Sequence, residues 1–187
     1  VRWYMYSINQ PGESKRFDEK ALQEMVRQNF GILMNVVSFY KMYEGVKGVK
    51  EVKGVEHVLD WWITARLAVL IRETTQQLEQ YKITEPVRAI GDFITDLSTW
   101  YLRRSRDRFK TAGPDRDNAI RVLRYVLLHL AKMLAPFTPF FVEGVYQRLK
   151  GHYASIHLED WPVADGRFID EKMMANMESV RRIVEIA

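Results

Sequence analysis

One run of residues in this chain has types and spacing that suit contact with a charged partner. It is WYLRRSRDRFK, Trp100 to Lys110, which combines four arginines and a lysine with three aromatic residues. Arginine and lysine bind phosphates, and aromatic rings and guanidinium planes stack on unpaired bases. The run therefore fits a surface that contacts RNA, although the same composition is also typical of cations that only solvate a helix end.

The cations of this run do not occupy equivalent positions on a helix. An apolar stripe with three-to-four-residue spacing leads into the run and consists of Ile90, Phe93, Ile94, Leu97, Trp100 and Tyr101. At about 100° per residue, Arg104 and Arg108 continue this stripe. The cations that fall on the open flank are Arg103, Arg106 and Lys110. We expect the flank to face phosphates, with Arg103 partly paired with Asp107, and the two stripe arginines to meet carboxylates or project beyond the bundle.

Positive charge continues beyond the run. Between Trp100 and Lys132 there are nine cations and three acids, a local balance of +6, whereas the whole chain carries +4. Such a concentration favours a polyanionic partner. Arg121 and Arg124 follow the next turn and are expected to extend a track for phosphates.

Apolar periodicity divides the chain into helices. They are predicted over residues 18–45, 56–81, 84–110, 115–134, 139–149 and 171–186. The predicted N-caps are Asp18, Thr84 and either Asp115 or Asp117. The segment VKGVKEVKGVE is typical of a mobile surface loop, and APFTPF of a tight corner.

These elements predict an all-α fold. It is an antiparallel helical bundle of four main helices, with a short fifth helix and an irregular C-terminal tail that ends in a final helix. Trp100 and Tyr101 are expected to pack inside this bundle and to support the arginines from behind.

Several classes of site are excluded or disfavoured. The chain has no cysteine, its four histidines have no ligand spacing, and it has no glycine-rich phosphate loop. The neighbouring acids Glu159 and Asp160 would point in different directions, which disfavours a catalytic carboxylate pair. We therefore expect no catalytic residues and no metal site. Because we find neither a bilayer-length apolar run nor a signal peptide, we also expect a soluble, cytoplasmic protein.

Longer motifs carry a family resemblance over nearly the whole chain. In order, they are RWYMYSINQPGESKRFDEKALQEMVRQNFGILMNVVSFY, HVLDWWITARL, DLSTWYLRRSRDRF, LAKMLAPFTPFFVEGVY and SIHLEDWP. Together they resemble the anticodon-binding region of class I aminoacyl-tRNA synthetases. The LAPFTPF corner also occurs in valyl and leucyl relatives, whereas WYLRRSRDRF with HLEDWP is most similar to isoleucyl-tRNA synthetases of the type shared by archaea, eukaryotes and some bacteria.

The resemblance implies a part of a larger enzyme. Residues 1–16 would end the connecting region beneath a catalytic domain, residues 17–150 would form the anticodon-binding bundle, and residues 151–187 would be a C-terminal extension with a junction helix. The parent would join isoleucine to its tRNA with ATP and magnesium. Because the HIGH and KMSKS signatures are absent from this sequence, the chain alone should be inactive and need no cofactor.

The implied partners are the anticodon stem-loop of isoleucine tRNA and the catalytic domain of the same chain, in a monomer without membrane contact. The candidate RNA-binding residues are Arg103, Arg104, Arg106, Arg108, Lys110, Arg121 and Arg124. A valyl- or leucyl-type anticodon domain remains an alternative. So do a helical scaffold whose basic face binds acidic proteins, and a general binder of double-stranded nucleic acid.

Overall fold

The computed structural model describes residues 1–44 and 57–186. The predicted loop VKGVKEVKGVE and the predicted helix start at Glu56 lie outside these residues. The described helices are α1 (Arg2–Ile8), α2 (Glu19–Met25), α3 (Ile32–Lys41), α4 (Val58–Glu79), α5 (Thr84–Asp96), α6 (Arg103–Lys110), α7 (Pro114–Leu134), α8 (Pro139–Arg148) and α9 (Glu171–Ile186). Two π-helical segments, η1 (Val26–Gly31) and η2 (Leu97–Leu102), join α2 to α3 and α5 to α6, and two short 3-10 turns, η3 (Ile156–Leu158) and η4 (Gly166–Phe168), precede α9.

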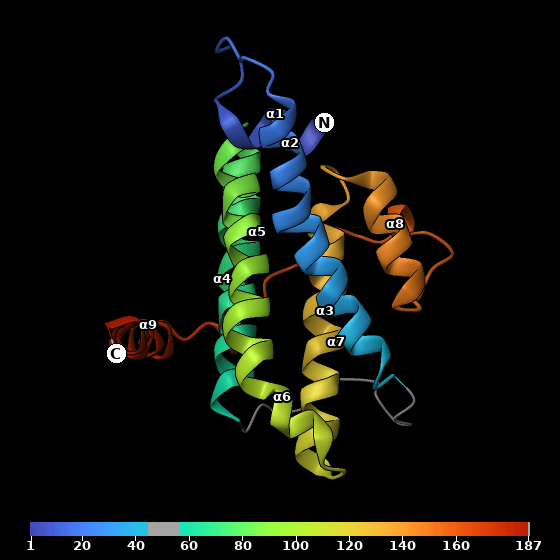
Figure 1. Cartoon of the computed structure of the whole chain (residues 1–187), viewed down its shortest axis with the longest axis vertical. Helices are drawn as coiled ribbons and strands as arrows, with labels where there is room; N and C mark the ends of the chain where they lie inside the picture. The colour runs from blue at the N-terminus through green and yellow to red at the C-terminus, as the bar shows by residue number, and fades with distance from the viewer. Residues whose placement is uncertain (45–56, 187) are drawn as a thin grey trace.

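Four long rods lie side by side along the molecule (Figure 1). They are α2–α3, α4, α5–α6 and α7, and successive rods run in opposite directions because the connections lie at alternate ends. The predicted antiparallel all-α bundle is confirmed, and no strand occurs in residues 1–44 or 57–186. Helix α8 flanks one side as the short fifth helix, and α9 ends the tail on the other side (Figure 1).

The observed helix starts confirm one of the predicted N-caps and contradict the others. Asp18 caps α2, since its carboxylate accepts hydrogen bonds from the N–H groups of Lys20 and Ala21 at 2.8 and 3.2 Å. Thr84 is instead the first residue of α5, and its hydroxyl donates to the Asn9 carbonyl at 3.1 Å, which ties the N-terminal segment to the bundle.

The cap predicted for α7 is also wrong. The N-cap is Gly113, and Pro114 occupies the first helical position, where the missing N–H of proline costs nothing. Asp115 and Asp117 therefore lie inside the first turn.

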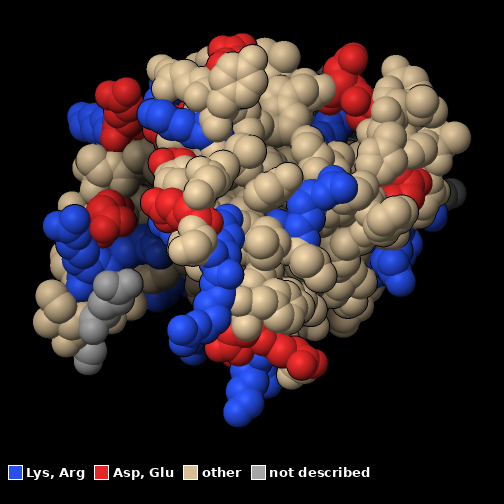
Figure 2. Space-filling view, turned by 90° about the horizontal axis from the view of Figure 1, so that it is seen from above, with Lys and Arg blue, Asp and Glu red and all other residues tan. Residues whose placement is uncertain are grey.

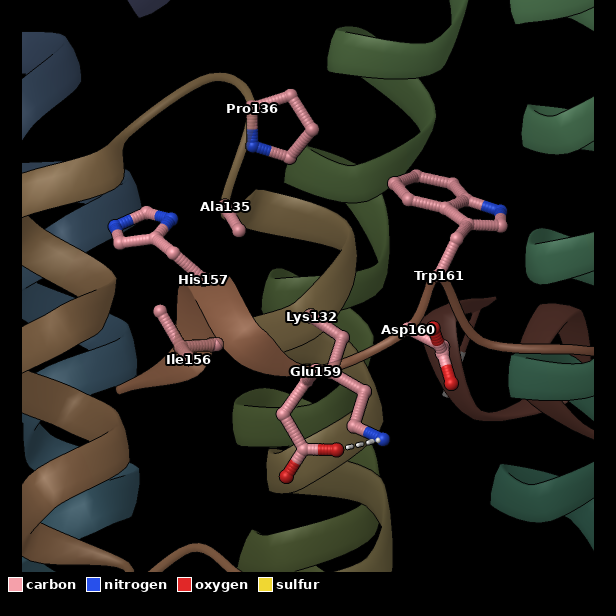
Figure 3. A pocket seen from close by; sticks show the side chains of 8 residues that line it. All are labelled: Lys132, Ala135, Pro136, Ile156, His157, Glu159, Asp160 and Trp161. Atoms are coloured by element: carbon pink, nitrogen blue, oxygen red, sulfur yellow. Dashed lines mark ion pairs between the residues drawn. The ribbon is translucent and has the colours of Figure 1, made fainter. Parts of the chain in front are cut away.

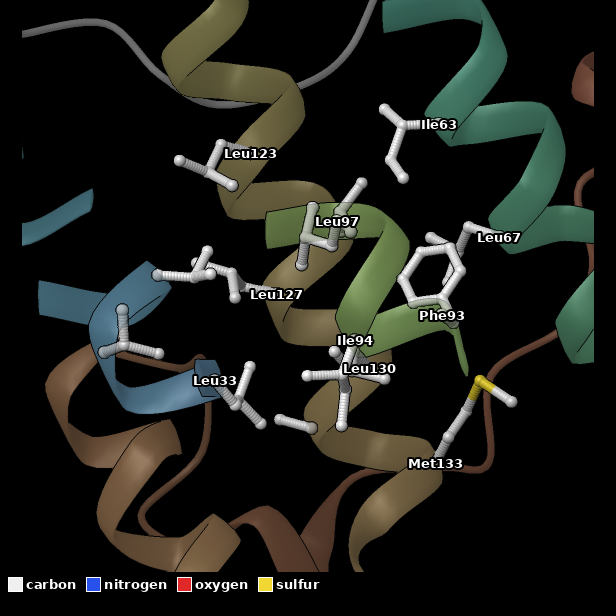
Figure 4. Packing of buried hydrophobic residues seen from close by; sticks show 14 of the residues in the cluster. Leu33, Ile63, Leu67, Phe93, Ile94, Leu97, Leu123, Leu127, Leu130 and Met133 are labelled. Carbon is white, nitrogen blue, oxygen red and sulfur yellow. The ribbon is translucent and has the colours of Figure 1, made fainter. Parts of the chain in front are cut away.

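The core lies between the four rods (Figure 4). Its labelled members come from α3, α4, α5, η2 and α7 and are Leu33, Ile63, Leu67, Phe93, Ile94, Leu97, Leu123, Leu127, Leu130 and Met133. Trp3, Ile156 and Met177 belong to the same cluster, so the segments before and after the bundle pack onto it. No described helix combines the length and apolar character that crossing a membrane requires.

Candidate RNA-binding surface

The basic run forms one end of the bundle. Its cations all lie on α6, which ends beside the start of α7 and the start of α4 (Figure 1). The exposed cations of this basic tip are Arg103, Arg104, Arg106 and Lys110. Figure 2 shows the molecule from the opposite end, where blue and red side chains are interspersed on a largely uncharged surface.

The segment η2 sets which side chains of the run face inward. A π-helical turn holds more residues than an α-helical turn, so it shifts the phase of every later residue. The inward positions are Leu97, Tyr101, Ser105 and Phe109, which are all fully buried and lie four residues apart. A uniform 100° step therefore misplaces Arg104, which is exposed and not in the core stripe.

Arg104 covers an aromatic residue instead of meeting a carboxylate. Its guanidinium carbon lies 3.9 Å from the centroid of the Trp100 ring, within cation-π range. Trp100 is 9% exposed and Tyr101 is fully buried, which confirms the prediction that both pack in the bundle. Trp100 thus supports Arg104 from below.

Ion pairing on the open flank also differs from the prediction. Asp107 bonds to Lys110, whose ammonium lies 2.6 Å from the carboxylate, and not to Arg103. The hydrogen bond from Lys110 lowers the pKa of Asp107, and the same bond raises the pKa of Lys110. Both side chains are largely exposed, so the pair adds little to stability. Within the described residues, Arg103 and Arg106 form no ion pair.

Arg108 points into the molecule. Its two terminal nitrogens donate to the Asp60 carboxylate at 2.8 and 2.7 Å, and it also donates to Asp115. Burial alone would lower the pKa of Arg108, but the bonds to Asp60 and Asp115 outweigh burial and raise it. This outcome agrees with the expectation that a stripe arginine meets carboxylates of neighbouring helices. All three guanidinium nitrogens of Arg108 therefore donate within the protein.

Asp60 is the centre of this buried network. It lies in the first turn of α4, has no exposed surface, and accepts further bonds from the Tyr101 hydroxyl at 2.8 Å and the Asn118 amide at 3.2 Å. Burial, and then the Asp60 charge, raise the pKa of Tyr101, which stays protonated and donates. The network joins α4, η2, α6 and α7 at the basic tip and fixes α6 in place.

The sequence offers a signal by which Asp60 could be identified, namely an acidic residue at an inward position of a helix. Asp60 lies between Leu59 and Ile63 on the inward stripe of its helix, and a buried acid must be paired. Its partners lie 41 to 58 residues away along the chain. The sequence indicates that a partner exists but does not identify it.

The two remaining candidates lie on the side of α7. Arg124 is half-buried and donates to the carbonyls of Leu149 and Lys150 after α8, at 3.3 and 3.0 Å. Arg121 is also half-buried, and its Nε has no hydrogen-bond partner in the described part of the chain. The structure therefore gathers four candidates at the basic tip, turns Arg108 inward, and places two on α7.

A second ion-pair cluster attaches α9 beside the tip. Asp96 pairs with Arg181 at 2.7 Å and with Arg66 at 3.4 Å. The Trp100 indole N–H points at the Met177 sulfur, 3.3 Å away. Helix α9 thus contributes to the burial of Trp100, the ring on which Arg104 lies.

The described residues contain no group of three or more histidine, aspartate or glutamate side chains that could hold a metal ion. Glu159, one of the two neighbouring acids, bonds to Lys132 at 2.7 Å (Figure 3) and accepts a hydrogen bond from Tyr146. Asp160 is exposed. These acids do not form a carboxylate pair.

Comparison with known proteins gives a consistent result. Residues 60–187 match the family model described as the anticodon-binding domain of tRNA ligase. The isoleucine–tRNA ligases of Deinococcus radiodurans and Thermus thermophilus are each 37% identical over the whole chain, and that of Dehalococcoides mccartyi is 38% identical over 98% of it. The chain covers 18 to 19% of these relatives, or about a fifth of their length.

One solved structure has a similar fold. A LeuRS from Agrobacterium radiobacter, in a ternary complex with tRNA and LeuAMS, superposes with a TM-score of 0.62 at 17% identity, over 90% of this chain and 20% of that one. At this identity the likeness concerns the fold alone. From the family match, and from isoleucine–tRNA ligase relatives that align with all or nearly all of its residues, this chain belongs to the family of anticodon-binding domains of tRNA ligases.

Proposed function

We propose that this chain is the anticodon-binding domain of an isoleucine–tRNA ligase, and that its basic tip binds the anticodon stem-loop of isoleucine tRNA. The observation that carries the proposal is the group of four exposed cations, Arg103, Arg104, Arg106 and Lys110, at one end of a rigid bundle. The family match and the isoleucine–tRNA ligase relatives support the choice of tRNA.

The chemistry of the tip suits an anticodon loop. Loop bases are unstacked, and proteins read them by stacking and by hydrogen bonds along their edges. The Arg104 guanidinium lies over the Trp100 ring, so its outer face would stack on a base. Arg103, Arg106 and Lys110 would contact phosphates. Arg108 would have an indirect role, because its hydrogen bonds to Asp60 hold α6 in place.

The activity would belong to the whole parent enzyme. We propose that the parent is a cytoplasmic monomer that joins isoleucine to tRNA with ATP and magnesium in its catalytic domain. This chain would add binding energy and anticodon selectivity to that reaction, and would be inactive alone.

The first test is a titration of this chain with an isoleucine tRNA transcript and with the same transcript carrying a swapped anticodon, each at two salt concentrations. We expect tighter binding of the native anticodon and a steep loss of affinity as salt rises, because phosphate contacts release counterions. Equal binding of the two transcripts would refute base reading by this domain. No binding at low salt would refute the function and favour the scaffold alternative.

A further inference from the structure

A cationic cavity lies on the side of α7, away from the basic tip. It has a volume of about 490 Å³ and is lined by Arg124, Leu128, His129, Lys132, Lys150, Gly151, His152 and Glu159. Three of these residues are cations, two are histidines and one is an acid. The cavity shares Lys132 and Glu159 with the neighbouring pocket of Figure 3, so this ion pair separates the two.

The wall of the cavity formed by residues 150–152 is held rigidly. Lys150 has a left-handed backbone with φ 52°. A Cβ at Gly151 would lie 1.8 Å from the buried Tyr146 ring, so the backbone can pass only without a side chain there. The Tyr146 hydroxyl donates to Glu159 and accepts the N–H of Tyr153 at 2.9 Å. The cavity is therefore preformed.

Its cations keep donors that a ligand can use. Both hydrogen bonds from Arg124 to carbonyls start at one terminal nitrogen, Nη2. A guanidinium has five N–H donors, and an ammonium has three. Arg124 also lies beside Tyr40. Lys132 and Lys150 are held by single carboxylates, Glu159 at 2.7 Å and Glu44 at 3.3 Å.

The electrostatics of the site favour an anion. Burial lowers the pKa of His129, and the charge of Lys132 lowers it further, although the Tyr125 carbonyl and Glu159 act in the opposite direction, so this ring is not counted among the cations. His129 Nδ1 lies 2.8 Å from the Tyr125 carbonyl, so the ring is already oriented. The cations around the cavity exceed the acids even when Glu44 is included. A tetrahedral anion with several acceptors would balance this excess.

We propose that this cavity binds a phosphate group, which Arg124, Lys132 and Lys150 hold by charge-assisted hydrogen bonds. In the RNA complex we assign it to a backbone phosphate, an identification that rests on the proposed function. Arg121, Arg124 and Lys132 lie three and eight residues apart, which places them on one face of α7 over about 16 Å. This face leads from the basic tip to the cavity.

The first experiment measures phosphate itself. Inorganic phosphate is titrated into the isotopically labelled full chain at constant ionic strength, and the amide and imidazole signals are followed by NMR. We expect saturable shifts at Gly151, His152 and His129. We also expect about fivefold weaker binding in Lys150→Gln, which keeps a long unbranched side chain at the left-handed position. The control is Lys82→Gln, an exposed cation at the other end of the bundle. No saturable shifts at the cavity would overturn the proposal.

The second experiment separates RNA phosphate from free phosphate. If the cavity holds a backbone phosphate, Lys150→Gln reduces the salt slope of tRNA binding by about one, and tRNA abolishes the phosphate-induced shifts. An unchanged slope with intact shifts would assign the cavity to free phosphate. Failure of the proposed function looks different, because tRNA binding would then be absent in the wild type while the shifts remain.

Discussion

Asp60 shows how one buried residue controls the placement of exposed ones. Its carboxylate has no exposed surface, yet it receives hydrogen bonds from Tyr101, Arg108 and Asn118, which come from three different elements. A buried charge is tolerated when its partners satisfy it, and removal of one member leaves the others unpaired. The exposed cations of α6 depend on this network for their position.

We therefore predict that Asp60→Ala destabilises the fold by about 3–5 kcal/mol, because the Arg108 guanidinium and the Tyr101 hydroxyl lose a buried acceptor. Urea unfolding followed by circular dichroism measures this change. The matched control is Asp92→Ala, an exposed acid on α5, which should change the free energy of unfolding by less than about 0.5 kcal/mol. Equal stabilities of the two variants would show that the network contributes nothing.

Glu159 allows a prediction about pH. Burial alone would raise the pKa of Glu159, but hydrogen bonds from Lys132 and Tyr146 outweigh burial and lower it. A folded pKa below the unfolded one contributes stability that is complete above the unfolded pKa of about 4.5 and is lost as pH falls through the folded pKa. Glu159→Gln should therefore lower the free energy of unfolding at pH 6 more than at pH 3. Unfolding curves at the two pH values measure this. Equal losses of unfolding free energy at pH 6 and pH 3 would contradict a lowered pKa of Glu159.

At the scale of the element, a break in helical regularity is the first limit on what sequence periodicity can predict. The apolar stripes give the rods and the core, including the inward placement of Trp100 and Tyr101, because 3.6-residue spacing holds within each α-helix. The π-helical segment η2 then shifts the phase, so the uniform step misplaces Arg104 and misses Ser105 as an inward residue. Apolar spacing contains no separate signal for an extra residue in a turn.

Long-range partners are the second limit. The sequence predicts that Arg108 either meets a carboxylate or projects beyond the bundle, and it does not identify Asp60, which lies 48 residues earlier. Likewise, Thr84 has the right type for a cap, yet its hydroxyl binds the Asn9 carbonyl 75 residues away. Local propensity predicts the type of interaction, whereas tertiary packing selects the atom that completes it.

The turn after α8 tests the role of packing at this scale. Gly151→Ala should destabilise the fold by about 1–3 kcal/mol, because its Cβ would overlap the buried Tyr146 ring. Gly166→Ala is the matched control, since a Cβ at Gly166 meets no atom within 4 Å. Thermal melts of the two variants provide the comparison. A Gly151→Ala variant as stable as its control would mean that the turn moves freely away from Tyr146.

Across the whole molecule, the two ends of the bundle differ in charge. At the basic tip the exposed cations Arg103, Arg104, Arg106 and Lys110 outnumber the exposed acids Asp107 and Asp115, whereas both signs are interspersed at the opposite end (Figure 2). A long-range field would attract RNA to the molecule without selecting a site, whereas a direct contact is lost only when the side chain that makes it is replaced. Substitutions that change the net charge equally at the two ends separate these effects.

The double variant Arg103→Gln/Arg106→Gln removes two charges at the tip, and Lys20→Gln/Arg27→Gln removes two charges in α2 and η1, where both side chains are exposed. If the tip contacts RNA, the first variant weakens tRNA binding and reduces its salt slope by about two, whereas the second leaves the slope nearly unchanged. Both should melt close to the wild type, because neither pair of side chains is buried. Fluorescence titrations over a range of salt measure the slopes. Equal reductions in the two variants would mean that RNA responds to total charge, and the tip would then have no special role.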